Sequence, residues 1–279
     1  MVSGQSSSGR ESNPIQSGPM AFPVMVALLV VGALQKAPSP SDEPFQIVDN
    51  SFLVEEAFNQ EPHIVQNIFG LTRQGHDWVM TFTQEWPAPA IRHQLSYTLG
   101  INSAGQSTEF GDILLNYRMQ VLEEGPGHPA FAPRVSAIVP SGDRSVGAGR
   151  TGLQVNLPFS KQDHDFYFHW NGGFTWVTRA DRPDLLSPTF AGSAIYRLRP
   201  MVNLMLESVL LVQAQDAGSG RVDHQAAFTL SPGVRGGWNV AKDAQIIIGL
   251  AVPVVRQGGE TDTAVFGYFS YELPFGKRP

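Results

Sequence analysis

The stretch 263-TAVFGYFSYELPF-275, close to the end of the chain, alternates between two kinds of side chain. Every second residue from Val265 to Phe275 is apolar, aromatic or glycine, and this set ends on an aromatic ring. The intervening residues become polar toward the C-terminal side, with Ser270 and Glu272. Because side chains alternate across a β-strand, the pattern predicts a strand with one face in an apolar medium and one face against a wetter one.

The composition of the 279-residue chain indicates a surface with fewer charged residues than a soluble protein has. Hydrophobic residues make up 42% and charged residues only 16%, well below the roughly one quarter found in soluble proteins. There is no cysteine, which excludes disulfides, thiolate metal sites and cysteine nucleophiles. The net charge of -6 argues against nucleic acid as a partner.

Twelve segments with strand character fill the chain from His63 onward, and we expect no amphipathic helix among them. Many reach the roughly 9–11 residues that a tilted strand needs to cross a bilayer. The segments lie near residues 63–71, 76–86, 91–101, 111–122, 131–140, 150–159, 163–177, 189–199, 201–214, 225–238, 244–255 and 263–275. Among the connections, we expect 215–224 and 256–262 to be external loops.

The same alternation recurs in the other segments. In 111–122, Leu115 and Tyr117 share one face, whereas Asn116 and Arg118 share the other. A barrel in lipid predicts apolar residues outside, polar residues inside and aromatic residues near the strand ends. The predicted fold class is therefore all-β: a closed antiparallel transmembrane barrel of about 12 strands over residues 63–275. Its partners would be outer-membrane lipid and the barrel-assembly machinery. A soluble two-sheet sandwich is the alternative fold.

The start of the chain carries an apolar run, 21-AFPVMVALLVVGAL-34, which is too short to span a bilayer as a helix. It fits the core of a secretory signal peptide, so residues 1–34 are predicted to be one, with Met1 or Met20 as the start. Residues 35–46 read as a linker, and residues 276–279 as a C-terminal tail.

Residues 47–62 contain the helix-like pattern of a short segment capped near Asp49 and stopped before Pro62. The segment is predicted to act either as a plug inside the barrel or as a periplasmic helix under its rim. The plug candidates are Phe52, Leu53, Glu55, Glu56 and Phe58.

The stretch 50-NSFLVEEAFNQEP-62, leading into the first strand, resembles the start of the outer-membrane transporter-like barrels of the phenol-degradation MetA-pathway family. The overall pattern is similar from Ile47 to Phe275. The resemblance implies a membrane barrel with uptake of hydrophobic or aromatic compounds, and it brings no catalytic residues with it.

The inward polar set is the candidate functional site. Charges in such an interior are expected to pair or to face water. Two interpretations stay open: a wet lumen whose charges select solutes, and a filled interior whose charges form structural ion pairs. The predicted lumen-lining residues are Glu85, Arg92, Asp112, Asn116, Arg118, Arg134, Asp165, Tyr167, His169, Arg197, Glu207, Arg235 and Glu272.

Other motifs carry little chemistry. Asp163, His164 and Asp165 lie together, but neighbours on a strand point to opposite faces, so no metal or other cofactor is predicted. The 147-GAGRTG-152 stretch matches a dinucleotide fingerprint without the strand before it or the helix after it.

The predicted function is passive, selective passage of small, hydrophobic or aromatic solutes through an outer-membrane barrel, without enzymatic activity. An outer-membrane hydrolase, a structural barrel with a filled lumen and a secreted sugar-binding sandwich are the alternatives.

Overall fold

The computed structural model describes residues 45–47, 49–104, 107–143, 149–180, 182–241 and 244–275. The predicted signal peptide, nearly all of the predicted linker and the predicted tail lie outside the described residues. Within these ranges, no helix has the length and apolar character needed to cross a membrane.

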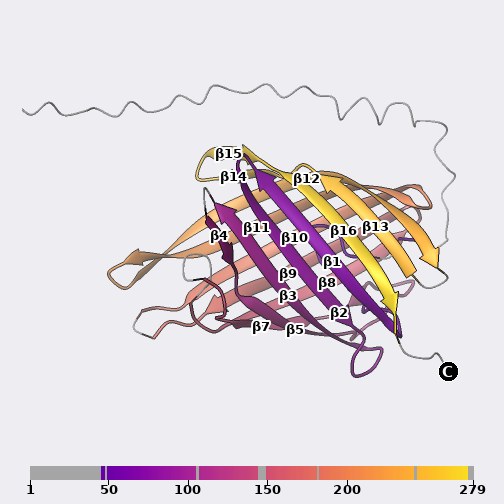
Figure 1. The fold of residues 1–279 in the computed structure, drawn as a ribbon, viewed down its shortest axis with the longest axis horizontal. Helices are drawn as coiled ribbons and strands as arrows, with labels where there is room; N and C mark the ends of the chain where they lie inside the picture. The colour runs from indigo at the N-terminus through magenta and orange to yellow at the C-terminus, as the bar shows by residue number, and fades with distance from the viewer. Residues whose placement is uncertain are drawn as a thin grey trace, which may run out of the picture. The chain divides into compact units, whose positions relative to one another are not determined.

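Twelve antiparallel strands form a closed ring (Figure 1). The ring runs through β1 (Ile64–Gln74), β2 (Asp77–Trp86), β3 (His93–Ala104), β5 (Ile113–Met119), β7 (Arg134–Val139), β8 (Gly152–Asp163), β9 (Phe166–Val177), β10 (Leu185–Arg199), β11 (Val202–Gly218), β12 (Arg221–Ala241), β13 (Ala244–Ala251) and β16 (Val265–Pro274). Four short strands extend its edges: β4 (Ser107–Phe110), β6 (Ala130–Phe131), β14 (Val254–Gln257) and β15 (Glu260–Thr263). Each of the twelve predicted segments overlaps one strand of the ring, so the predicted fold class is confirmed.

The last strand closes the barrel on the first one. β16 pairs with β1 in an uninterrupted register from Ile64 opposite Pro274 to Arg73 opposite Val265. Its other edge pairs with β13. A closed ring has no free strand edge, which removes the unpaired backbone groups that lipid cannot satisfy.

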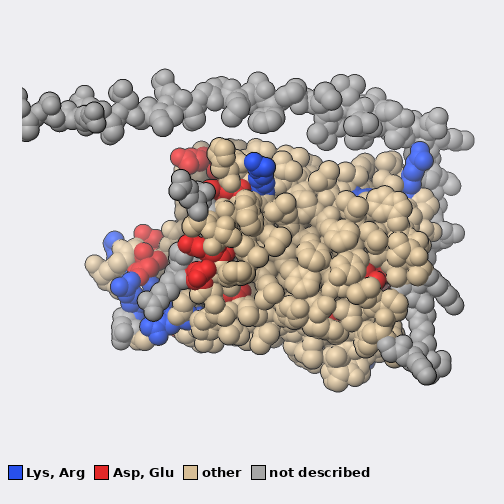
Figure 2. Space-filling model, viewed as in Figure 1, with Lys and Arg blue, Asp and Glu red and all other residues tan. Residues whose placement is uncertain are grey.

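The apolar face of the strands looks outward. Leu115 is 52% exposed on β5 and Val265 is 55% exposed on β16, whereas their neighbours Asn116 and Phe266 are buried. Trp170 and Trp176 of β9 are exposed in the same way. Figure 2 shows most of the Lys, Arg, Asp and Glu side chains of one face near one end, beside a broad surface with few charges. This surface is the lipid-facing band of a transmembrane barrel, and the sandwich alternative is wrong.

The two ends of the barrel differ. The chain enters β1 at the end of the barrel where β16 finishes, which we call the terminal end. The β1–β2 hairpin lies at the opposite end, the loop end (Figure 1). The predicted bounds of two connections at the loop end are too wide, because strands continue into both of them. Residues 215–224 continue β11 and β12 around a tight turn, and residues 256–262 form the β14–β15 hairpin. Glycines with positive φ make both turns: Gly218 and Gly220, and Gly258 and Gly259.

Residues 45–47 and 49–62, which we call the luminal segment, contain no helix, so the predicted short helix is wrong. The backbone amides that a helix would bond to its own carbonyls are bonded here to side chains of the barrel wall. The Glu55 amide donates to Asn171 Oδ1 at 2.8 Å, for example, and the Gln60 amide donates to Gln94 Oε1 at 2.7 Å. Side chains distant in sequence therefore compete successfully with local helical bonds.

Candidate functional site: the barrel lumen

The structure brings most of the predicted lumen residues together around the luminal segment. Nine of them are buried, eight on the inward face of the strands and Asp165 in the turn just before β9: Glu85, Asn116, Arg118, Asp165, Tyr167, His169, Arg197, Glu207 and Arg235. Arg134 and Glu272 are partly buried, and both hydrogen-bond inside the barrel, Arg134 to Glu55 and Glu272 to the Gln245 amide.

Two predicted residues lie at the barrel ends instead. Arg92 is exposed just before β3 and donates to the backbone carbonyls of Gln120 and Val121, so it is not inside the lumen. Asp112 lies just before β5 at the loop end and accepts a bond from the Gly142 amide. Both share the inward parity of their strand, but the strand begins only after them, so parity does not fix their direction.

The wall holds the backbone of the luminal segment through its polar side chains. Glu207 Oε1 accepts the amides of Leu53 and Val54 at 2.8 and 3.2 Å. Ser160 Oγ accepts the Ala57 amide at 2.8 Å. These contacts come from strands β8 and β11, which are separated by β9 and β10, so the segment is held from several sides of the lumen.

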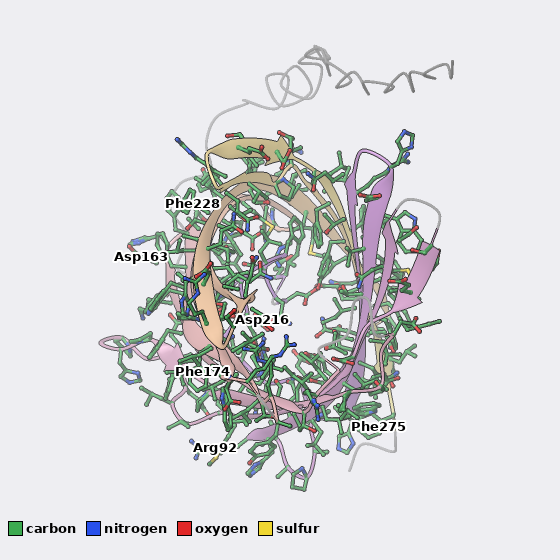
Figure 3. The ribbon with its side chains drawn as sticks, turned by 90° about the vertical axis from the view of Figure 1, so that its left-hand side faces the viewer. Arg92, Asp163, Phe174, Asp216, Phe228 and Phe275 are labelled. Carbon is green, nitrogen blue, oxygen red and sulfur yellow. The ribbon has the colours of Figure 1, made fainter. Side chains whose placement is uncertain are left out.

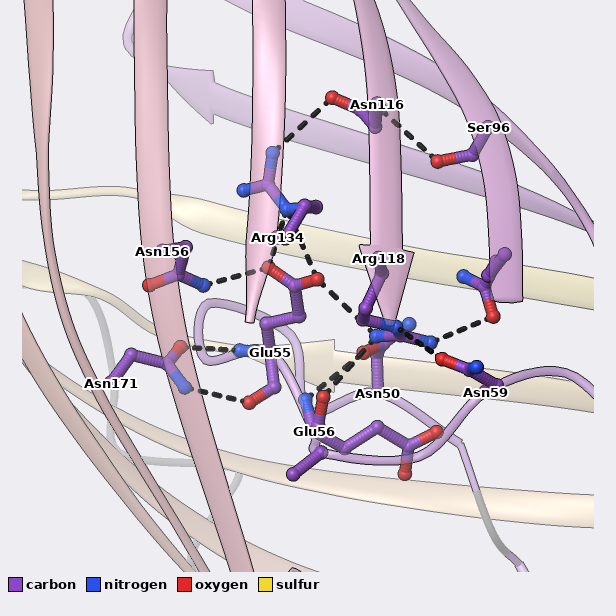
Figure 4. A network of polar contacts seen from close by, with 12 residues as sticks. Asn50, Glu55, Glu56, Asn59, Ser96, Asn116, Arg118, Arg134, Asn156 and Asn171 are labelled. Atoms are coloured by element: carbon purple, nitrogen blue, oxygen red, sulfur yellow. Dashed lines mark hydrogen bonds and ion pairs between the residues drawn. The ribbon is translucent and has the colours of Figure 1, made fainter. Parts of the chain in front are cut away.

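Glu55 is the electrostatic centre of this contact (Figure 4). Its Oε2 lies 2.8 Å from Arg134 Nε and accepts a 2.7 Å bond from Asn156, and its Oε1 lies 3.2 Å from Arg118 Nη1. Arg118 also donates to the Glu56 carbonyl at 3.2 Å. Two arginines of the wall thus share one carboxylate of the luminal segment, which is a strong arrangement because every bond is charge-assisted.

Neighbouring acidic residues of the luminal segment have opposite protonation behaviour. Burial works to raise the pKa of Glu55, but Arg134 and Arg118 outweigh it and hold that pKa below its ordinary value. Burial raises the pKa of Glu56 to about 8, and Arg118 only partly offsets this. Within the described residues, Glu56 Oε2 is buried without a hydrogen-bond partner. Glu55 is therefore the charged anchor, and Glu56 is mostly protonated at neutral pH.

Asp49 makes a second polar anchor on the other side of the lumen. Its carboxylate accepts bonds from Gln66 at 2.8 Å, Tyr268 at 2.8 Å and Ser270 at 2.7 Å. Arg235 donates to the Asp49 carbonyl at 2.9 Å. The anchor joins the segment to β1, β12 and β16.

Apolar contacts hold the start of the luminal segment near the terminal end. Phe45 packs on Tyr167 with ring centroids 5.3 Å apart, and the Arg197 guanidinium lies 4.7 Å above the Phe45 ring. Arg197 is itself paired with Asp165 at 2.9 Å. Ile47 is fully buried against Ile247, and Phe52 packs between Phe266 and Tyr268.

Two cavities lie on the loop-end side of the luminal segment. One has a volume of about 320 Å³ and the other about 200 Å³. Both are lined by Leu53, Glu55, Arg134 and Gln154. Figure 3 looks into the barrel from the loop end. The lumen is therefore hollow on this side and occupied by the segment beyond it.

Sequence reasoning missed the neutral side chains that do much of the holding. Gln94, Asn156, Ser160 and Asn171 all bind the luminal segment. Gln94 and Asn171 each lie two residues from a predicted lumen residue, Arg92 and His169, so period-2 parity was the signal that identifies them. Asn156 and Ser160 lie on β8, where no lumen residue was predicted.

A serine–histidine pair lies under the luminal segment. Ser160 Oγ is 2.7 Å from His169 Nδ1, and His169 Nε2 is buried with no hydrogen-bond partner among the described residues. A hydrolytic triad needs a carboxylate on the other ring nitrogen, and Ser160 Oγ is already occupied by the Ala57 amide. The pair acts as a support for the segment. The described ranges also contain no group of three or more His, Asp or Glu side chains arranged to hold a metal ion.

Comparison with known proteins agrees with this architecture. Residues 46–272 match the protein family described as "Putative MetA-pathway of phenol degradation". Among solved structures, the COG4313 outer membrane channel from Pseudomonas putida F1 superimposes with a TM-score of 0.64 at 11% identity, covering 78% of this chain and 98% of that one. The NanC porin covers 76% of this chain and 100% of its own at 11% identity, with a TM-score of 0.45. No curated protein sequence matches the chain. At 11% identity, the similarity to the COG4313 channel concerns the fold, which is that of an outer-membrane barrel.

Proposed function

This chain belongs to the family described as a putative MetA pathway of phenol degradation, and we propose that it is an outer-membrane channel for small solutes, closed by its luminal segment. Solutes would move passively down their gradient. The lipid-facing band and the closed ring support a place in the outer membrane.

One observation supports the proposal: the segment that lies in the lumen is held by many polar contacts in addition to its apolar ones. The Glu207, Ser160 and Gln94 side chains bind its backbone, and Arg118 and Arg134 bind its Glu55 carboxylate. Each neutral bond of this kind contributes about 0.5–1.5 kcal/mol net and each bond to a charged group about 1.5–3 kcal/mol, because water can replace the lost partner. Contacts of this kind suit a segment that leaves and returns better than one that is packed permanently.

We expect the two loop-end cavities to determine which solutes pass through the channel. The larger one combines the apolar side chains of Phe52, Ile68 and Phe266 with the hydroxyls of Thr81, Thr83 and Thr98. The remaining lining is mostly polar and includes the charged side chains of Glu55, Glu85 and Arg134. Binding sites for small organic solutes combine apolar side chains with polar groups that fix the orientation of the solute. This lining supports small aromatic or hydrophobic solutes with one polar group as the cargo.

Deleting residues 51–61 tests the proposed plug. The deletion removes Glu55 and the backbone groups bound by the wall, so we expect a several-fold higher conductance in planar bilayers and faster swelling of liposomes in small sugars. Heat-modifiable mobility on gels would show that the barrel still folds. Equal conductance of a folded deletion variant and the wild type would overturn the plug role.

A further inference from the structure

The Glu55 site has a property that reaches beyond closure: the wall of the barrel is built to bind a carboxylate, and a residue of the chain itself occupies the place. Resting on the proposed channel function, we propose that small monocarboxylates with an apolar body bind in the loop-end cavity, displace the Glu55 carboxylate from Arg134 and so release the luminal segment.

Arg134 is fixed in place by the wall before any solute arrives. Its Nη1 donates to Asn116 at 3.2 Å and also bonds Ser136, and its Nη2 donates to Gln154 at 2.9 Å. These three partners are neutral, so they orient the guanidinium without neutralising it. Its Nε is left to the carboxylate, which it meets at 2.8 and 3.0 Å. A preoriented guanidinium is a specific binding group for carboxylates.

The charge balance couples solute binding to opening. When Glu55 leaves, Arg118 and Arg134 lose the carboxylate that they share, while Glu85 remains as an acidic residue of the cavity lining. Leaving a partly buried guanidinium without an anion is costly. A solute carboxylate that takes the vacated place removes this cost, so it favours the open state over the closed one. A neutral solute gives no such compensation.

The position of the site makes the exchange accessible from one side. Glu55 and Arg134 line both loop-end cavities, and their side chains are 18% and 16% exposed. The same larger cavity presents Phe52, Ile68, Leu114 and Phe266. A one-ring carboxylate can therefore place its ring against the apolar wall and its carboxylate toward Arg134. The predicted class of ligand is an amphipathic monocarboxylate.

Calorimetric titration of the detergent-solubilised full chain tests the proposal with benzoate and with its neutral counterpart benzamide. We expect benzoate to bind at least tenfold more tightly than benzamide. Arg134→Gln should weaken benzoate binding at least tenfold, whereas Glu55→Gln should tighten it several-fold because the internal competitor is gone. Lys161→Gln, which removes an ion pair with Glu124 outside the cavities, should leave the affinity unchanged.

Two outcomes would overturn the proposal: equal affinity for benzoate and benzamide, or the absence of benzoate binding. A benzoate affinity that changes in neither Arg134→Gln nor Glu55→Gln would also overturn it, because the ligand would then bind at another place. If Arg134→Gln fails to fold, the opposite shift expected for Glu55→Gln still decides. The deletion of residues 51–61 tests the channel function separately. If the deletion raises conductance but the full chain does not bind benzoate, only the proposed class of ligand is contradicted.

Discussion

The outer and inner faces of the same strands obey opposite rules. On β5, Leu115 and Tyr117 face outward and make an apolar surface, whereas Asn116 and Arg118 face inward and make hydrogen bonds and ion pairs. The outer face requires only that its side chains be apolar, since any apolar side chain can contact lipid. The inner face needs partners, since each polar group there must meet a particular group of the wall or the luminal segment. The outer face is therefore tolerant of exchange within a class, and the inner face is not.

The largest expected effect comes from placing a charge on the outer face. Leu115→Lys puts an ammonium group against lipid near the middle of β5, and we expect it to lower the free energy of unfolding by about 2–4 kcal/mol. The matched variant is Leu114→Lys, whose side chain faces the loop-end cavity and should cost less than about half as much. Urea unfolding of the barrel in lipid vesicles measures both. Equal losses would mean that the two faces do not differ in environment.

An intermediate effect is expected from the inner face. Glu55→Gln removes the charge shared by Arg118 and Arg134, so docking of the luminal segment should weaken by about 1–3 kcal/mol. Hydrogen exchange of the amides of residues 53–60 should then be about ten- to a hundredfold faster. Glu56→Gln is the contrasting variant: at neutral pH a released Glu56 is ionised and must take up a proton to dock, so the variant should dock more tightly and its exchange should become slower, not faster.

The pH dependence of docking should distinguish Glu55 from Glu56. The pKa of Glu56 is about 8 in the docked segment and ordinary in a released one, so the docked form holds an extra proton between these values. Docking should therefore weaken as the pH rises toward 8, and Glu56→Gln should remove this trend. Glu55 acts with the opposite sign, because its lowered pKa stabilises docking above its ordinary pKa and loses that contribution in acid. A Glu56→Gln variant with the full wild-type trend would contradict this assignment.

The difference between the two faces also explains what the sequence predicts. Strand positions and facing follow from a period of two, and the alternation around Val265 and Leu115 is enough to give twelve strands and the lipid side. The same period predicts that Arg118 faces inward. It does not predict that Glu55 is the partner of Arg118, because the two residues are 63 positions apart and only the folded chain brings them together. Local pattern predicted a helix at residues 52–58 for the same reason: it cannot show that Asn171 and Ser160 take the amides. The hairpin at residues 215–224 contains Gly218 and Gly220, which favour a tight turn, but the prediction did not use them.

Closure by the luminal segment is most directly tested by tethering it. Ser51 Oγ lies 2.8 Å from Ser193 Oγ of β10, and the chain has no cysteine of its own, so Ser51→Cys with Ser193→Cys introduces a single possible disulfide. In planar bilayers, we expect the oxidised double variant to stay closed, reduction to restore wild-type opening, and Ser193→Cys alone to respond to neither treatment. A current through the oxidised, fully cross-linked protein equal to that of its reduced form would contradict the claim that this segment closes the channel.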